Sequence, residues 1–131
     1  MHTSTFLGNP VGCAMALAQI EEIRRRNLVQ CSADLGGSLR SVLSELRPAS
    51  AELRLETRGL GLLAGLELSR RDGSPATDEA LRTIKSMLHR GFILLPEGED
   101  ANVISFAPPL IITKAQIRAT ANALQGALMD V

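Results

Sequence analysis

Apolar residues near the start of the chain recur at helical spacing. After Pro10 they fall three and four positions apart, at Cys13, Leu17 and Ile20, which together form one face of a helix. Asn9 comes directly before this run. An asparagine side chain can cap a helix, and proline suits the first helical position because its missing N–H would have no partner there. The pattern therefore predicts a first helix that begins at Pro10.

A second helix is predicted over residues 28–46, and Pro48 ends it. Gly36 and Gly37 lie inside this helix, where each glycine costs about 1 kcal/mol relative to alanine. We therefore expect either that another part of the chain packs closely here or that the helix bends. The apolar stripe of this helix consists of Leu28, Leu35, Leu39, Val42 and Leu46.

The pattern then changes to a period of two. Apolar and charged residues alternate over 53–58, as in a strand with one solvated face. The segment "RGLGLLAGLEL" (58–68) predicts a glycine turn followed by an apolar strand over 62–68. "FILLPEG" and "NVISFAPPL" predict two further short strands, and the second stops at its paired prolines.

A third helix is predicted between the two pairs of strands. Thr77 is the expected cap, Leu81, Ile84 and Leu88 are the expected buried face, and Gly91 closes the helix.

The segment "TKAQ" (113–116) has the pattern of a capping box and predicts a final helix. The predicted order is helix, helix, strand, strand, helix, strand, strand, helix. This order favours an α+β fold in which helices cover one face of a small, mostly antiparallel sheet. The apolar face of the last helix consists of Ile117, Ala121, Leu124 and Leu128.

Composition excludes some classes of partner. The 131 residues include 14 basic and 14 acidic side chains, so the formal net charge gives no reason to expect nucleic acid or an anionic membrane. Three Phe residues, with no Tyr or Trp, offer no platform on which bases would stack. We expect no nucleic acid and no membrane among the partners of this chain.

The two cysteines favour a reducing compartment. Cys13 and Cys31 are far apart in sequence and lack a CxxC partner, so we expect two buried free thiols rather than a disulfide. The sequence shows no secretory leader and no apolar run close to the roughly 20 residues that a membrane span needs. A cytoplasmic location is the resulting expectation.

Three features of the sequence carry little weight as evidence for a functional site. The glycines of "RGLGLLAG" have the wrong spacing for a dinucleotide fingerprint, and a strand follows where a helix must begin. His2 and His89 are single and far apart, so no metal site is expected. Lys85 and Lys114 lie on a helix and in a helix cap, which does not favour a nucleophilic amine.

The opening segment offers a possible anion site. Ser4 and Thr5 carry hydroxyl groups in a non-helical stretch just before a helix start, where backbone N–H groups point outward and can hold a phosphate. The same residues also suit a simple polar leader to a capped helix. The residues alone leave both interpretations open.

Three segments resemble motifs of the class III aminotransferases, the ornithine, acetylornithine and 4-aminobutyrate type. They are "HTSTFLGNPVGCAMALAQIEEI", "RGLGLLAGLEL" and "NVISFAPPLIIT", and they occur in the family's order across nearly the whole chain. The resemblance implies a pyridoxal 5′-phosphate (PLP) enzyme and, for this chain, its C-terminal part. The fold implied is the small domain of a fold-type I PLP-dependent transferase.

The resemblance also implies a division of the chain. Residues 1–27 would form the cofactor-phosphate segment and the interdomain helix, and residues 28–131 the small C-terminal α+β domain. In the family a preceding large domain carries the lysine that forms a Schiff base with PLP. We therefore expect no catalytic residue here and no activity from these residues alone. The implied partners are the chain's own large domain and a homodimer partner.

The resemblance assigns roles to single residues. The threonine that corresponds to Thr5 binds the phosphate of the neighbouring subunit's cofactor, and Ser4 lies beside it, with its own role left open. Many members have an arginine, which grips a substrate carboxylate, at the position of Ser105. Two alternatives stay open: the neighbouring register differs, or another arginine compensates, although Arg58 is expected to hold the glycine turn instead. Ser105 predicts an amine, ω-amino acid or amino alcohol donor rather than an α-amino acid held by its carboxylate.

Three functions remain open at this point. The first is transfer of an amino group from an amine, ω-amino acid or ornithine-like donor to a 2-oxo acid. The second is an isomerase or decarboxylase that uses the same cofactor. The third is a non-catalytic α+β interaction module, which requires the first helix to bury its apolar stripe within this chain.

Overall fold

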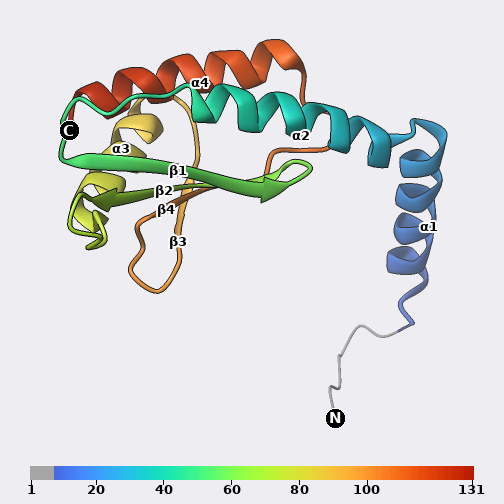
Figure 1. Cartoon of the computed structure of the whole chain (residues 1–131). Helices are drawn as coiled ribbons and strands as arrows, with labels where there is room; N and C mark the ends of the chain where they lie inside the picture. The colour runs from blue at the N-terminus through green and yellow to red at the C-terminus, as the bar shows by residue number, and fades with distance from the viewer. Residues whose placement is uncertain (1–7) are drawn as a thin grey trace.

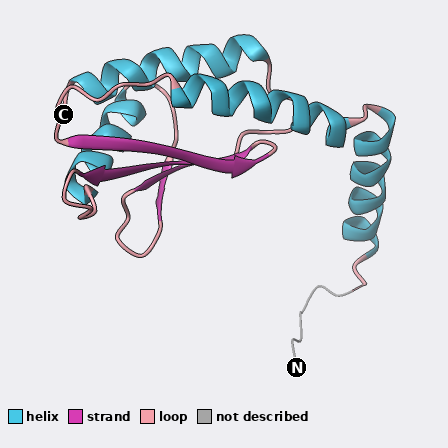
Figure 2. Cartoon of the chain, in the orientation of Figure 1, coloured by secondary structure: helices cyan, strands magenta, loops and turns pink. Residues whose placement is uncertain are grey.

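The predicted order of helices and strands is confirmed. The computed structural model describes residues 8–131, which form four helices and four strands. Figures 1 and 2 show how these elements are arranged. The elements are α1 Pro10–Arg25, α2 Leu28–Ser44, β1 Leu53–Leu60, β2 Leu63–Arg70, α3 Thr77–His89, β3 Leu95–Glu97, β4 Val103–Phe106 and α4 Lys114–Met129.

The four strands form one antiparallel sheet in the order β1-β2-β4-β3. Helices α2 and α3 pack on one face of this sheet, α4 packs against both of them on the same side, and α1 projects away (Figure 1). The opposite face, which we call the open face, is covered by no helix of the described chain. This arrangement confirms the α+β prediction of a small antiparallel sheet with helices on one side.

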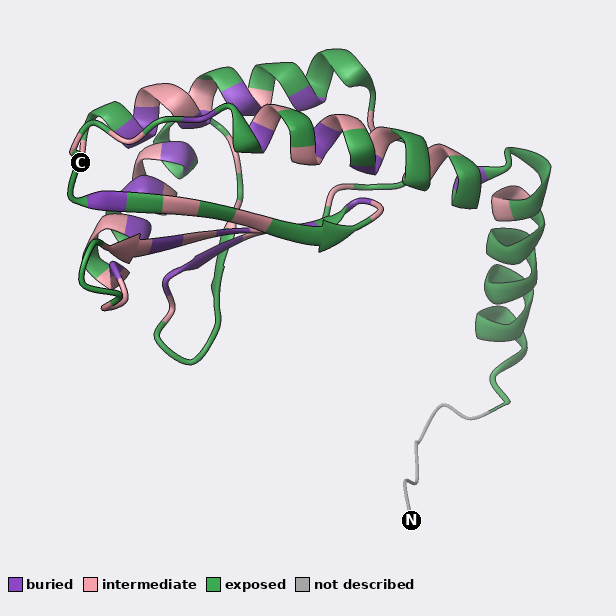
Figure 3. Cartoon of the chain, in the orientation of Figure 1, coloured by how far each residue is buried: buried purple, intermediate pink, exposed green. Residues whose placement is uncertain are grey.

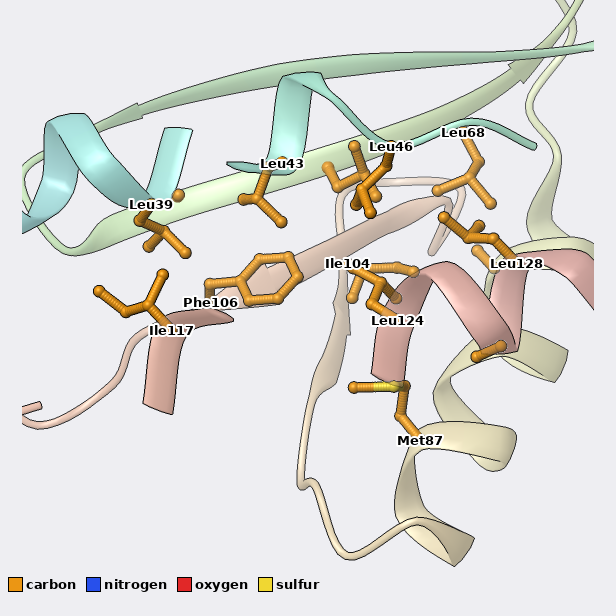
Figure 4. Close-up of a cluster of buried hydrophobic side chains, with 14 of the residues drawn as sticks. Leu39, Leu43, Leu46, Leu68, Met87, Ile104, Phe106, Ile117, Leu124 and Leu128 are labelled. Atoms are coloured by element: carbon orange, nitrogen blue, oxygen red, sulfur yellow. The ribbon is translucent and has the colours of Figure 1, made fainter. Parts of the chain in front are cut away.

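The hydrophobic core lies between the sheet and the three covering helices (Figure 4). It forms there because alternate residues of each strand point toward the helices, while the residues between them point to the open face. The large hydrophobic side chains that are fully buried there are Leu43, Leu66, Leu68, Met87, Ile104, Ile117, Leu124 and Leu128.

Helix α1 has no buried residue, and it is exposed except at Glu22 and Ile23 near its C-terminal end, which are half-buried (Figure 3). Its apolar side chains face solvent in this chain, and Leu17 is 63% exposed. This exposure corrects one expectation. Cys13 is exposed and Cys31 is only half-buried, although both thiols are free as predicted. Cys13 lies on the uncovered helix, so nothing in the described chain buries it.

Two helix starts agree with the sequence. The Asn9 side-chain oxygen accepts hydrogen bonds from the backbone N–H groups of Val11 and Gly12, and proline occupies the first turn of α1. Thr113 and Gln116 form the predicted capping box at the start of α4.

The buried face of α3 agrees with its prediction only in part, because Ile84 packs against the core but the two predicted leucines do not. Leu81 and Leu88 are 40% and 57% exposed, and the buried residues are Ala80, Thr83 and Met87. In both places the buried residue, Ala80 or Met87, directly precedes the exposed leucine. Which residues of α3 are buried is set by the elements that pack beside it, and hydrophobicity alone does not reveal this.

Thr77 is not the cap of α3. The N-cap residue is Ala76, which makes no side-chain cap bond, and the Thr77 hydroxyl donates instead to the carbonyl oxygen of Asp100 at 2.6 Å. A partner distant in sequence therefore replaces the predicted local contact. Gly91 follows the helix with a φ of 86° and closes it as expected.

Across residues 8–131, no helix combines the length and the hydropathy that crossing a membrane would require.

Candidate functional site

Ser105 lies on β4, and its register places it on the open face. It pairs with Gly65 of β2 on one side and with Leu95 of β3 on the other. Gly65 in turn pairs with Arg58 of β1. Paired residues in an antiparallel sheet share a face, so the four positions form one row across all four strands. We call Arg58, Gly65, Ser105 and Leu95 the open-face row.

Arg58 does not hold the glycine turn, contrary to the sequence expectation. Its guanidinium forms an ion pair with the Glu67 carboxylate on β2. Another residue, Arg40 of α2, donates to the carbonyl oxygen of Gly59 at the turn, at 3.4 Å. Arg58 extends from a strand whose pairing turns it to the open face, and this pairing cannot be read from the local motif.

Each of the two carboxylate oxygens of Glu67 has a partner. Its second oxygen accepts a hydrogen bond at 3.4 Å from the amide of Asn102, whose nitrogen also donates to the carbonyl oxygen of Leu68 at 2.9 Å. Asn102 is buried at 6% exposure, so it is a fixed anchor for this network. Sequence analysis singled out neither Glu67 nor Asn102, although both lie within the segments that carry the family resemblance.

Helix α2 fixes the turn between β1 and β2. A Cβ atom added to Gly36 would lie 2.1 Å from the carbonyl oxygen of Gly61, so the two backbones are in direct contact. The Ser32 hydroxyl accepts a hydrogen bond from the backbone N–H of Leu62 at 3.3 Å. The close packing predicted around the glycine pair is confirmed at Gly36, whereas Gly37 has open space around it.

The candidate phosphate-binding residues lie outside the part of the chain that the structure describes. Ser4 and Thr5 lie outside the described residues, as does His2. The first N–H groups of α1 already bond to Asn9. Both lysines, Lys85 and Lys114, are exposed on helix surfaces, which does not suit a lysine that must hold a cofactor in a closed site.

No group of three potential metal ligands occurs within residues 8–131. Two hollows on the surface lie away from the open-face row. A groove of about 820 Å³ runs between α2 and α4, and an apolar pocket of about 260 Å³ is lined by side chains that include Phe92, Phe106 and Pro109. Neither hollow is lined by Arg58 or Ser105.

Comparison with known protein families identifies this chain. The family model for aminotransferase class-III matches residues 1–128, and the chain belongs to that family. An acetylornithine aminotransferase from Nostoc sp. is 38% identical over 130 residues, which are 99% of this chain and 29% of that relative. The chain therefore spans less than a third of the length of this relative.

Solved structures agree with this assignment. An aminotransferase from Bacillus anthracis matches 99% of this chain and 30% of its own, with a TM-score of 0.87 and 31% identity. A phospholyase from Arthrobacter, in complex with phosphoethanolamine, matches all of this chain and 31% of its own, with a TM-score of 0.88 and 26% identity. The fold of this chain is thus shared by enzymes named for different reactions.

Proposed function

We propose that the protein carrying this chain is a PLP-dependent aminotransferase. It transfers an amino group from an amine, ω-amino acid or ornithine-like donor to a 2-oxo acid. Membership of the class III family over residues 1–128 is the observation that carries the proposal. When bound, PLP supplies an electron sink for bonds at the amine-bearing carbon, and the protein supplies binding and orientation.

Residues 1–27 and 28–131 have separate roles in this proposal. The Thr5 hydroxyl, with Ser4 beside it, donates a hydrogen bond to the phosphate of the cofactor in the homodimer partner. The large domain of the same protein covers the apolar side of α1. The exposure of Val11, Met15 and Leu17, each above 60%, supports a covering partner for this helix. The proposed location is the cytoplasm.

Ser105 sets the class of donor in this proposal. It is neutral and half-buried on the open face, so it cannot form the bidentate contact that an arginine makes with a carboxylate. A donor whose amino group lies far from any carboxylate, or one without a carboxylate, does not require this contact.

Kinetics of the whole protein test the role of Ser105. We expect a diamine or ω-amino acid to be a better donor than an α-amino acid, and Ser105→Arg to lower KM for the α-amino acid. Ser69→Arg is the control because Ser69 lies on the same face of β2 and gains the same charge away from the row. The donor assignment is wrong if α-amino acids are already preferred and Ser105→Arg leaves their KM unchanged.

A different reaction on the same cofactor is the second candidate. The close structural match to a phospholyase favours it, because that enzyme shares the fold of this chain without being named for amino transfer. An isomerase or decarboxylase is open on the same ground. Product analysis separates these reactions, since only transamination produces a new amino acid from the 2-oxo acid.

A non-catalytic interaction module receives no support from α1. That function required the helix to bury its apolar stripe within this chain, and α1 buries none of its residues.

A further inference from the structure

We propose that the outer edge of β1 pairs with the same edge of a second copy of this chain, so that two four-stranded sheets join into one. β1 is an edge strand, and no strand of the described chain lies on its outer side (Figure 1). It pairs with β2 from Leu53 to Leu60 without a bulge, and it contains no proline. Natural proteins commonly use bulges and prolines to keep an edge strand from pairing with another chain. This pairing does not depend on the proposed amino transfer.

Hydrogen bonds at the two ends of β1 show which of its backbone groups face outward. The carbonyl oxygen of Glu52, just before β1, accepts a hydrogen bond from the N–H of Arg71, which follows β2. Backbone groups alternate in direction along an antiparallel strand, so those of the odd-numbered residues of β1 point away from β2. The carbonyl oxygen of Gly59 agrees with this, because it accepts from Arg40 of α2 and not from β2.

Leu55 and Thr57 offer free backbone groups on this edge. Among residues 8–131, their N–H and carbonyl groups have no hydrogen-bond partner. The N–H of Leu53 is already bonded to the carbonyl oxygen of Ser50, but the Leu53 carbonyl oxygen is free. An antiparallel second copy that places Leu55 opposite its own equivalent gains a hydrogen bond in each direction between these residues. The N–H of Thr57 can then donate to the Leu53 carbonyl oxygen of the other copy, and no existing bond breaks.

The charged side chains of β1 complement one another in this register. Arg54, Glu56 and Arg58 alternate in sign on the open face, and Glu52 continues the alternation just before the strand. When Leu55 faces its equivalent, Arg54 of each copy faces Glu56 of the other. Arg58 of each copy then faces Glu52 of the other. Opposite charges directly across an antiparallel pair stabilise it, and like charges destabilise it. A register that places Glu56 opposite its equivalent also brings Arg54 opposite Arg58, so it is disfavoured.

Two of these charges have no ion-pair partner among residues 8–131, namely Arg54 and Glu56. Glu56 stands opposite Glu67 of β2, an arrangement of like charges that destabilises a sheet. Glu67 has its own cation, Arg58, whereas Glu56 has none. A second copy supplies Arg54 to Glu56 from the free side of the strand. This complementarity of the edge with itself favours a second copy over a strand of unrelated sequence.

Sedimentation velocity of the whole protein tests the pairing. We expect the unaltered protein to reach at least twice the mass of Glu56→Arg at the same concentration, because that variant places arginine opposite Arg54 of the other copy. Arg54→Glu combined with Glu56→Arg should restore the larger mass, since the exchanged charges again face opposite ones. Glu99→Arg is the matched control, because it makes the same change of charge at an exposed turn outside the sheet and should leave the mass unchanged.

Hydrogen exchange identifies what covers the edge. We expect the N–H groups of Leu55 and Thr57 to exchange about 10-fold more slowly at high than at low protein concentration, because association protects them. Glu56→Arg should abolish this dependence. Thr57→Pro removes one edge N–H at a place where a sheet tolerates proline, and it serves as the second variant should Glu56→Arg fail to fold.

Three results would overturn the pairing and leave the proposed aminotransferase intact. The first is equal mass of the unaltered protein and Glu56→Arg, or an equal loss of mass in Glu99→Arg. The second is failure of the exchanged pair of charges to restore the mass. The third is exchange at Leu55 and Thr57 that does not depend on concentration. Slow exchange of that kind would mean that another segment of the same protein covers the edge, and fast exchange would mean that nothing does.

Discussion

The contact between α2 and the β1–β2 turn leads to a sharp prediction about Gly36. In Gly36→Ala the new Cβ would lie 2.1 Å from the carbonyl oxygen of Gly61 and 2.3 Å from its carbonyl carbon. Both atoms belong to the backbone, so no side-chain rotation relieves the clash. The helix and the turn must separate by about 1 Å, and overpacking of this kind costs about 1–3 kcal/mol.

Helix propensity works in the opposite direction. Alanine in place of glycine stabilises a helix interior by about 1 kcal/mol. Because both clashing atoms are backbone atoms, we expect the clash to outweigh this gain and Gly36→Ala to lower the free energy of unfolding by up to about 2 kcal/mol. Gly37→Ala is the matched control, since no atom lies within 4 Å of its added Cβ, and it should raise the free energy of unfolding by up to about 1 kcal/mol.

Urea unfolding of the protein and its two variants, followed by circular dichroism, measures both changes. Opposite signs for two neighbouring glycines on one helix would identify the contact with Gly61 as the cause. If both variants are stabilised, the two backbones are not in contact and our account of how α2 fixes the turn fails.

Two further predictions concern single hydrogen-bonding groups. Thr113→Ala removes the bond to the N–H of Gln116 and should cost about 1 kcal/mol in urea unfolding, whereas Thr120→Ala should cost less; equal losses would contradict a specific cap. Burial tends to raise the pKa of Glu79, but a backbone hydrogen bond and Arg70 outweigh it, so the net pKa lies below its ordinary 4.5. The ionised Glu79 carboxylate stabilises the fold fully above pH 4.5, and this stabilisation is lost as the pH falls through the lowered pKa. Glu79→Gln should therefore make the free energy of unfolding fall less steeply at acidic pH. An unchanged slope would contradict this.

Features that depend on neighbours in sequence could be predicted. Asn9 with Pro10 and Thr113 with Gln116 are local signals, because a cap and its partners lie within three residues. The order of helices and strands followed from periodicity for the same reason.

Features that depend on tertiary partners could not be predicted. The burial of α3 and the partner of Thr77 are set by what packs beside them, and sequence analysis was wrong about Leu81, Leu88 and the Thr77 cap. Arg58 was assigned to the turn because its neighbours in sequence are glycines. Its actual partner, Glu67, becomes its neighbour only through the register of β1 and β2.

The candidate site shows the same division. The family motifs in the sequence point to Ser105, but only the pairing of four strands places Arg58, Gly65 and Ser105 in one row. Thr5 and Ser4 lie outside the described residues, so their proposed contact with a phosphate stays a prediction. Replacing Thr5 by alanine and measuring cofactor binding would test it.

Transfer of isotope from donor to acceptor tests the central claim most directly. The whole protein, supplied with PLP, would be given a ¹⁵N-labelled diamine and a 2-oxo acid, and the products would be analysed by mass spectrometry. Our account predicts ¹⁵N in an amino acid with the carbon skeleton of the oxo acid. Consumption of the donor while the oxo acid stays unaminated would contradict it.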